Sequence, residues 1–403
     1  MSNTVDINWS SKHGRAELQK IGNKVKMALP TSYVEQKKWA VNVVVEIKGQ
    51  RALKTTSAKE FLHELRAPAS SIRRPSLAIE SLPAYIPDLK QETEVSSVAI
   101  SRYDLTSVKV LALFNLGFVF FDAENRVLEE ISSQYYPLLE LNSNIMKVLD
   151  SCEHYPTTAT FIADWFFERN YAHWLLDTIP RLLNRVGKVV CHKPEQQWQK
   201  ALLSLYGIKE SDIVPLEPNS CFSFDRLLMD GKSSCPVPHP SYKCHKGAIE
   251  FIRKPLCSLV QEGQSPLIAL VIKRFDSRIV VNSHRLEDML VKLGYVVQVI
   301  DCAAIPVAEQ IRCFSAADVI IGAHGAAMAN TVFCKPDSHI LEIFPPSYGN
   351  PAFWAISNTV GAKYSAVTAV EEIDVVDKHA RYRDIKLSEN SFTLISNYLS
   401  VGK

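Results

Sequence analysis

The chain has 403 residues, of which 47% are hydrophobic and 22% charged, and its formal net charge is +2. This composition excludes a disordered or fibrous chain and is typical of a soluble globular protein with ample core. Because a single core stops growing at roughly 250–300 residues, the length predicts two domains.

The first 80 residues are basic, with 14 Lys or Arg against 7 Asp or Glu. Such a segment can rest on anionic lipid or nucleic acid, but a solvated, partly irregular N-terminal region is the simpler interpretation. No apolar segment typical of a secretory signal follows the first charges, and the apolar run 110–121 is too short for a ~30 Å bilayer core. We therefore expect a cytoplasmic protein, with peripheral association at the inner membrane surface as an option and no nucleic-acid partner.

The cysteines indicate neither a zinc site nor a disulfide framework. There are nine, and no two have the CxxC spacing of a metal half-site. We expect reduced thiols, as in a cytoplasm.

The first domain is predicted to span residues 1–263, with 1–90 as a basic, poorly assigned leader. Short apolar runs between 97 and 141 predict a small antiparallel sheet. Strands and helices then alternate, which predicts a first open α/β sheet; the segments are a strand at 157–165, a helix to about 185, a strand at 188–191, a helix at 194–207 and a strand near 212–217. A proline-rich loop at 229–247 and a helix at 248–263 complete the domain, with its boundary near Gly263.

The second domain, residues 264–385, alternates more regularly. Its expected strands lie at 266–274, 295–301, 319–323 and 339–345, with helices at 283–294, 306–318 and after 324. The almost continuous apolar runs are typical of buried parallel strands, so the pattern predicts a doubly wound, Rossmann-like sheet. A terminal helix within 386–403 could pack back across the first domain.

Charged residues gather where the strand 266–274 ends, in "VIKRFDSRIVVN". Ligands of open α/β sheets bind outside the carboxyl ends of the strands, and guanidinium groups suit phosphate oxygens. Arg274, Arg278 and Asn282 are therefore candidate phosphate-binding residues. The alternative is a loop that is simply charged.

A glycine-containing turn follows a later strand, in "VIIGAHGAAMAN". Gly325 and Ala326 would let backbone N–H groups approach a diphosphate, with His324 beside them and Asn330 on the helix that follows. Glu342, twenty residues after Gly322, could accept hydrogen bonds from ribose. A dinucleotide dehydrogenase would share the acidic residue, but the first Gly-x-Gly turn is absent.

The stretch "ERNYAHWLLDTIPRLL" puts four polar residues on one face of a helix: Asn170, His173, Asp177 and Arg181. A solvated stripe is the simplest interpretation. However, Pro180 inside the helix removes a hydrogen bond and bends it, and Trp174 beside such a bend favours a cleft.

Together these segments resemble glycosyltransferase family 61, from about Asn170 to Glu342, through "NYAHWLLDTIPRL", "RFDSRIVVN", "EQIRCFSAADVIIGAHGAAMANTVF" and "ILEIFP". The resemblance implies a GT-B fold, in which two Rossmann-like domains face a central cleft, here with extra N-terminal strands and helices. It also implies inverting sugar transfer from a nucleotide-sugar, with no catalytic metal and no other cofactor. The chain contains no Asp-x-Asp motif, which agrees with this implication.

Inverting transfer needs a base for the acceptor hydroxyl and cations for the departing diphosphate. We expect His173 with Asp177 as the base, with Asp177 itself or His324 as alternatives. Arg274, Arg278, Asn282, His324, Gly325, Ala326, Asn330 and Glu342 would hold the donor, and Asn170, Trp174 and Arg181 would line the acceptor side. The expected partners are a nucleotide-sugar, most simply UDP-linked, and a glycan or lipid-linked glycan of a bacterial capsule, O-antigen or exopolysaccharide. An oxidoreductase and a catalytically silent nucleotide-sugar-binding protein remain alternatives.

Overall fold

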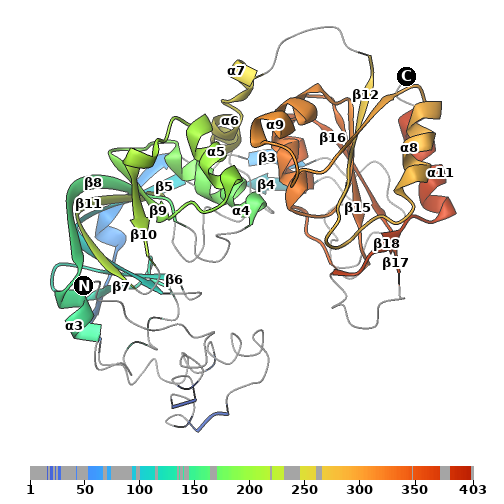
Figure 1. Ribbon diagram of the computed structural model, residues 1–403. Coiled ribbons are helices and arrows are strands. Elements are labelled where there is room, and N and C mark those ends of the chain that lie inside the picture. Colours follow the sequence, from blue (N-terminus) through green and yellow to red (C-terminus); the bar gives the residue numbers. More distant parts are fainter. Residues whose placement is uncertain are drawn as a thin grey trace.

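The computed structural model describes residues 53–66, 70–73, 93–96, 100–113, 117–133, 136, 139, 145–163, 170–217, 220–230, 246–259, 266–346, 348–372 and 382–400, with isolated positions between 16 and 42. Most of the basic leader, the proline-rich loop and the proposed boundary at Gly263 lie outside these residues. Within them, two α/β halves on separate sheets lie beside each other (Figure 1).

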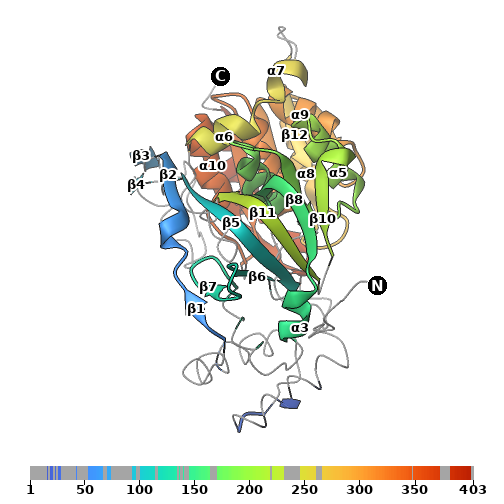
Figure 2. The same ribbon diagram turned by 90° about the vertical axis from the view of Figure 1, so that its left-hand side faces the viewer.

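The first sheet has nine strands and combines a parallel with an antiparallel part. Its strands are β1 (Thr55–Thr56), β2 (Leu62–Arg66), β5 (Ile100–Leu113), β6 (Gly117–Phe121), β7 (Val127–Leu128), β8 (Glu153–Phe161), β9 (Lys188–His192), β10 (Ile213–Leu216) and β11 (Cys221–Asp230). The strands β11, β8, β9 and β10 pair in parallel, whereas β5 pairs antiparallel with β11, β6 and β2. The long strands of this sheet cross the front of the side view (Figure 2). A separate hairpin joins β3 (Ser70–Arg73) to β4 (Thr93–Ser96).

Helical segments connect the parallel strands of this half. They are α4 (Tyr171–His173), η4 (Trp174–Thr178), η5 (Ile179–Leu182), α5 (Gln197–Leu205) and η6 (Glu210–Asp212), while η1 (Lys59–Phe61), α3 (Ile145–Asp150), α6 (Lys246–Ile252) and α7 (Leu256–Leu259) lie elsewhere in it. The β-α-β succession and the extra antiparallel strands were both expected from the sequence.

The second sheet is entirely parallel, in the order β13-β12-β14-β15-β16. Its elements are β12 (Ile268–Ile272), α8 (Ser283–Lys292), β13 (Val296–Ile300), α9 (Val307–Ala316), β14 (Val319–Ala323), η7 (Ala326–Phe333), β15 (His339–Phe344), α10 (Ala352–Val360), β16 (Lys363–Thr368), the short pair β17 (Val370–Glu371) and β18 (Ile385–Lys386), and α11 (Glu389–Ser400). This is the 2-1-3-4-5 order of a doubly wound fold, whose ligand site lies at the carboxyl ends of the central strands.

The two halves share one hydrophobic core. Side chains of β12 alternate between the two faces of its sheet: Ile268, Leu270 and Ile272 join the core cluster that also contains the first sheet, whereas Ala269 and Val271 join a second cluster. Each half still has its own sheet with helices around it, so the predicted α/β fold class, of the kind seen in GT-B proteins, is confirmed.

The terminal helix α11 packs on the second domain. Its Phe392, Ile395 and Leu399 lie in the cluster that contains Val271 of β12 and Leu286 of α8, and α8 and α11 stand together in Figure 1. The suggestion that this helix packs back across the first domain is therefore wrong, because its apolar stripe covers the outer face of the second sheet.

Cys152 and Cys221 form a disulfide where β8 and β11 begin side by side. The expectation that the thiols are reduced is wrong for this pair. Cys191, Cys302 and Cys334 are free, and burial raises the pKa of each thiol to about 12.

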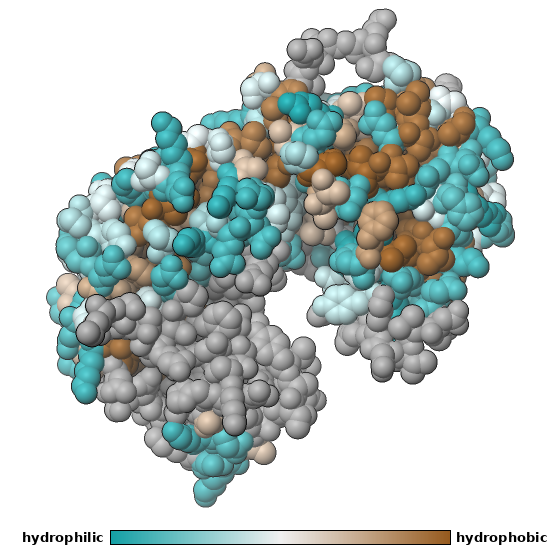
Figure 3. All heavy atoms as spheres, in the orientation of Figure 1, coloured by the Kyte–Doolittle hydropathy of each residue, from teal (hydrophilic) through white to brown (hydrophobic). Residues whose placement is uncertain are grey.

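The described surface is mainly hydrophilic, with apolar side chains gathered over part of the second domain (Figure 3). Exposed apolar residues of this domain include Val291 on α8 and Val296 and Val299 on the edge strand β13. Among the helices within the described ranges, none is both long and apolar enough to traverse a lipid bilayer.

Candidate active site

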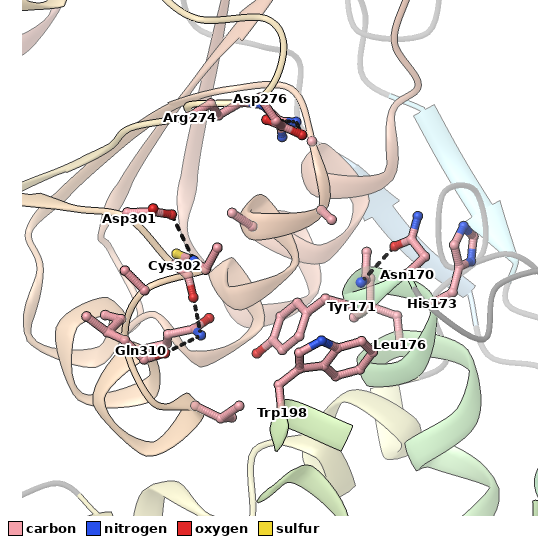
Figure 4. Close-up of a pocket in the computed structure, with 18 of the residues that line it drawn as sticks. Asn170, Tyr171, His173, Leu176, Trp198, Arg274, Asp276, Asp301, Cys302 and Gln310 are labelled. Carbon is pink, nitrogen blue, oxygen red and sulfur yellow. Dashed lines mark hydrogen bonds and ion pairs between the residues drawn. The ribbon is translucent and has the colours of Figure 1, made fainter. Parts of the chain in front are cut away.

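A cavity of about 1250 Å³ lies between the two halves and takes its walls from both. The first half contributes residues of α4, η4 and α5, and the second contributes the loops after β12, β13, β14 and β15. Figure 4 shows Arg274 and Asp276 at one end of this space and Tyr171 and Trp198 at the other. These loops follow the carboxyl ends of the parallel strands, as expected for a doubly wound sheet.

The helix that carries the His-Asp pair changes geometry along its length. Asn170 caps its start, and the Asn170 side chain accepts a hydrogen bond from the Ala172 N–H at 3.0 Å. The helix continues as a π turn through η4 and as a 3₁₀ turn through η5, where Pro180 is near the start. The irregularity expected at Pro180 is therefore present, and π turns often occur at functional sites.

His173 and Asp177 form a close pair in this helix. His173 Nδ1 lies 2.6 Å from Asp177 Oδ2, the Asp177 carboxyl is buried, and both residues line the cavity. A carboxylate at Nδ1 favours the tautomer with its hydrogen there, which leaves the lone pair on Nε2. The sequence permitted this contact, and the structure contains it.

Two arginines enter the cavity from the loop after β12. Arg274 donates from Nε to the Ser277 carbonyl at 2.7 Å, and its Nη2 lies 3.0 Å from a carboxylate oxygen of the largely exposed Asp276. Lys273, also in the lining, pairs with Glu287 at 2.9 Å. Arg274 and Lys273 thus each have an acidic neighbour.

Arg278 is 9% exposed, forms no salt bridge with the described residues, and its buried Nε has no hydrogen-bond acceptor among them. The charge of Asp276 acts on this guanidinium without pairing with it. Burial, and next the charge of Arg274, lowers the pKa of this guanidinium. The ring of Tyr348 lies 5.2 Å from its Cζ. A buried cation beside another cation is costly unless an anion joins them, so this loop is suited to bind one.

Gly325 makes room for this arrangement. A Cβ at this position would lie 2.1 Å from Nη1 of Arg274 and 3.5 Å from Nη2 of Arg278. Its backbone is extended, so the need for glycine is steric. Gly325 and Ala326 line the cavity, as expected, and η7, which starts here, is a 3₁₀ helix.

His324 forms a second histidine–carboxylate pair in the same cavity. Its Nδ1 makes a short hydrogen bond with Glu342, whose other oxygen accepts from the Tyr364 hydroxyl at 2.5 Å. The ring stacks on Phe344, with centroids 5.2 Å apart. Burial and the adjacent Glu342 raise the pKa of Tyr364 well above its usual value, so this phenol remains a donor.

Several sequence-predicted site residues lie elsewhere. Glu342 is fully buried behind His324 and is not part of the lining, so the ribose role is wrong. Asn282 exchanges hydrogen bonds of 2.9 and 3.0 Å with the backbone of Leu387 and ties the loop to the C-terminal segment. Asn330 accepts from the Tyr171 hydroxyl at 2.6 Å and donates to Gln310 at 2.8 Å. Both amides are used inside the protein.

The acceptor-side predictions are also partly wrong. Asn170 lines the cavity, but Trp174 and Arg181 are buried and do not. Arg181 donates to the Ala163 carbonyl at 3.1 Å. Of the four polar residues on this helix face, Asn170, His173 and Asp177 line the cavity, and Arg181 lies inside the protein.

The lining also includes residues from three segments that were not expected from the sequence. Trp198 on α5, Tyr348 after β15 and the stretch 301–307 after β13 all reach the cavity. The sequence offered a signal for one of these segments, because residues 301–307 follow a predicted strand, where ligands of such sheets bind. As for metals, no cluster of three or more His, Cys, Asp or Glu side chains suited to an ion occurs in the described part of the chain.

Residues 171–341 match the family model "Glycosyltransferase 61". This segment, which is less than half of the chain, is thus similar to glycosyltransferase family 61. The matched region begins on α4 and ends in β15, one residue before Glu342. It contains His173, Asp177 and His324, together with the arginine loop and Gly325.

Two curated rice proteins are similar over part of this region. The chain is 36% identical over 77 residues to "Beta-1,2-xylosyltransferase RCN11" of Oryza sativa subsp. japonica, which is 19% of this chain and 13% of that protein. It is 29% identical over 145 residues to "Alpha-1,3-arabinosyltransferase XAT3" of the same plant, which is 32% of this chain and 24% of that protein. The matches thus span no more than about a quarter of either relative.

Among solved structures, the chain is similar to two crystal structures of TibC, one of the iron-containing dodecameric glycosyltransferase from enterotoxigenic E. coli H10407 and one of the heptosyltransferase in complex with ADP-D-beta-D-heptose. The TM-scores are 0.29 and 0.30, with 11% identity. The matches cover 64% and 87% of this chain, and 79% and 95% of those chains. Likeness at this level carries no statement about the site.

Proposed function

We propose that this protein is a glycosyltransferase that moves a sugar from a nucleotide-sugar to a glycan acceptor, with inversion and without a catalytic metal. The match of residues 171–341 to the model of glycosyltransferase family 61 supports the reaction class. The observation that carries the proposal is Arg278, a buried guanidinium without an acidic partner in the described residues, which faces the cavity beside Arg274.

The two arginines would bind the donor diphosphate. Charge that develops on a leaving diphosphate must be met by fixed cations and N–H donors when no metal does so. Among the described residues Arg278 forms no salt bridge, and the carboxylate that pairs with Arg274 is that of the exposed Asp276, which a diphosphate can displace. Gly325 allows the ligand and Arg274 to approach the same turn.

The acceptor hydroxyl would lose its proton to His173. The imidazole accepts it at Nε2, and Asp177, 2.6 Å from Nδ1, stabilises the cation that forms. His324, held by Glu342 next to the arginine turn, is the alternative base and otherwise contacts the donor. Asp177 is less suited than His173 to act as the base alone, because its carboxyl is buried behind His173.

The finer assignments belong to the same proposal. They are a uridine donor, a bacterial capsule, O-antigen or exopolysaccharide acceptor, and a cytoplasmic location with the basic residues 1–90 near the inner membrane. The Cys152–Cys221 disulfide removes the reduced-thiol argument for the cytoplasm, so the location rests on the basic segment alone. A silent sugar-nucleotide-binding protein and an oxidoreductase are the competing functions, and the ligand that binds distinguishes them.

The test is a thermal-shift panel of UDP, GDP, CMP, NAD and UDP-sugars, followed by transfer assays with Arg274→Ala and Arg278→Ala. A ligand that binds only the folded state raises the melting temperature. We expect UDP compounds to give the largest shift, and both variants to lose that shift and at least about 100-fold in donor-dependent turnover.

The matched control is Arg312→Ala, because Arg312 is exposed, pairs with Glu309 and lies outside the cavity. It should retain both nucleotide binding and turnover. A nicotinamide-nucleotide shift larger than that of UDP, or full activity in both cavity variants, would refute the proposal.

A further inference from the structure

The cavity has a cationic end and an aromatic end. Among the described residues, the lysine and arginine side chains of its lining lie on the segment 273–278. The end formed by α4, α5 and the start of α9 is instead lined by Trp198, Ala201 and Pro306 together with glutamine side chains, and its charged groups are confined to the His173–Asp177 pair. Figure 4 shows Trp198 and Tyr171 well away from Arg274. An anionic ligand and a neutral ligand are thus favoured at different ends.

The cavity has room for both. Pockets that enclose one small ligand usually measure roughly 300–1,000 Å³. This cavity measures about 1250 Å³ and opens on two domains. A nucleotide-sugar at the arginine end therefore leaves space at the aromatic end.

Trp198 is fixed in place but remains half-buried. Its ring meets Tyr171 edge-on, with centroids 5.6 Å apart and planes at 74°, and meets Trp174 at 5.8 Å and 89°. Tyr171 is itself held by its hydrogen bond to Asn330. These contacts preorganise the indole, which costs a ligand little ordering entropy. Large aromatic side chains that line a cavity in this way present an apolar face to a ligand.

Polar groups beside the indole complete a surface for carbohydrate. Gln196 and Gln197 are exposed, line the cavity and stand next to Trp198 in the chain. A sugar ring has an apolar C–H face, which stacks on aromatic rings, and a rim of hydroxyls, which amides can both donate to and accept from. A nucleobase could stack on the indole as well, and the titration in the presence of saturating UDP distinguishes this from stacking of a sugar ring.

We propose that Trp198 is the platform on which a neutral sugar ring of the acceptor glycan stacks, with Gln197 as a hydroxyl partner. This inference rests on the proposed glycosyltransferase function and adds to it the acceptor subsite and the chemical class that it takes. Trp198 is a binding residue and does not touch the donor diphosphate.

The experiment measures donor and acceptor separately in the full chain. The acceptor probes are xylotetraose, cellotetraose and mannotetraose, with tetragalacturonate as the anionic comparison. Each is titrated in the presence of saturating UDP while the tryptophan fluorescence is recorded. We expect at least one neutral probe to change the fluorescence of the wild-type protein, and the anionic probe to bind at least about tenfold more weakly.

The variants are Trp198→Leu, which keeps bulk without the ring, and Trp198→Phe, which keeps a smaller ring. We expect Trp198→Leu to weaken neutral-probe binding, measured by calorimetry, and to raise the acceptor KM by at least about tenfold with an unchanged UDP affinity. Trp198→Phe should recover part of this loss. Gln197→Ala is a second variant that leaves the aromatic packing intact, and it should weaken the same probe by about threefold.

The outcomes are distinct. If UDP binds and transfer occurs, but Trp198→Leu and Gln197→Ala keep the wild-type acceptor KM, the platform is refuted while the proposed function stands. If the wild-type protein binds neither UDP nor any probe, the proposed function fails and the platform fails with it. If Trp198→Leu does not fold, the Gln197→Ala result and the wild-type fluorescence response decide.

Discussion

A methyl group at Gly325 would occupy the space that holds the Arg274 guanidinium, because its Cβ would lie 2.1 Å from Nη1. The obstructing atom is the end of a flexible side chain, so Gly325→Ala should displace Arg274 at little cost in stability. We expect the UDP affinity to fall by about 10- to 100-fold, the effect of losing a charged hydrogen bond, with a melting temperature close to wild type. Calorimetry and thermal unfolding measure the two effects.

Gly322→Ala is the contrasting control. Its Cβ would lie 3.0 Å from Met328 Sδ and 3.1 Å from Ile272 Cβ, inside the core. We expect this variant to lose about 1–3 kcal/mol of stability by overpacking and to keep its nucleotide affinity once folded. The reverse pattern, with Gly325→Ala unstable but binding normally, would show that the glycine serves packing alone.

At the scale of single residues, the sequence could predict which positions are unusual but not always which way they face. The motifs and their order along the chain predicted four site residues that do line the cavity, namely His173, Asp177, Arg274 and Gly325. Glu342 was found as well, but on β15 it shares a sheet face with Ile340 and Phe344, which are in the shared core. The position of a residue along a strand does not reveal that its face of the sheet is covered by the hydrophobic core. Trp198 sits in an ordinary amphipathic helix, so nothing in its pattern distinguished it from a core residue.

At the scale of elements, α11 is attached to the second sheet by a polar contact as well as by its apolar stripe. His339, at the start of β15, makes a short hydrogen bond through Nε2 with the Tyr398 hydroxyl on α11. Burial, and next the charge of Lys363, lowers the pKa of His339 to about 4, against 6.5 for the model compound. The helix itself was predicted from the sequence, but its docking face was not, because both sheets offered apolar partners.

This shift predicts a loss of stability in mild acid. Above pH 6.5 His339 is neutral in both states and has no effect. Below it the unfolded chain binds a proton that the folded chain does not, so the free energy of unfolding falls until the pH reaches about 4. Between pH 7.5 and 5 the contribution is at most about 2 kcal/mol, and partial solvent exposure reduces it. Urea unfolding at both pH values measures it, and His339→Gln should flatten the difference. An identical pH dependence in His339→Gln would exclude this histidine as the cause.

At the scale of the whole molecule, two domains were expected from the length, and two sheets are present. The sequence did not reveal that they share a core, because that depends on which face of β12 turns toward the first half. The inner residues Ile268, Leu270 and Ile272 are as apolar as the outer Ala269 and Val271. A shared core resists sliding of the domains, so we expect the substrates to enter a cavity that is already formed.

A hydrogen-bond chain crosses between the halves, from Tyr171 on α4 to Asn330 on η7 and from there to Gln310 on α9. Tyr171→Phe would leave the buried Asn330 carbonyl without its donor, which costs about 1–3 kcal/mol. Because the halves share a core, we expect calorimetry to record one unfolding transition in the wild-type protein, and the variant to lower the temperature of that same transition. Tyr206→Phe removes a similar hydrogen bond, to the Ile252 carbonyl at 2.6 Å within the first half, and should shift the single transition comparably. If instead two transitions appear, and Tyr206→Phe moves only one of them, the halves unfold independently and the core is not continuous in energetic terms.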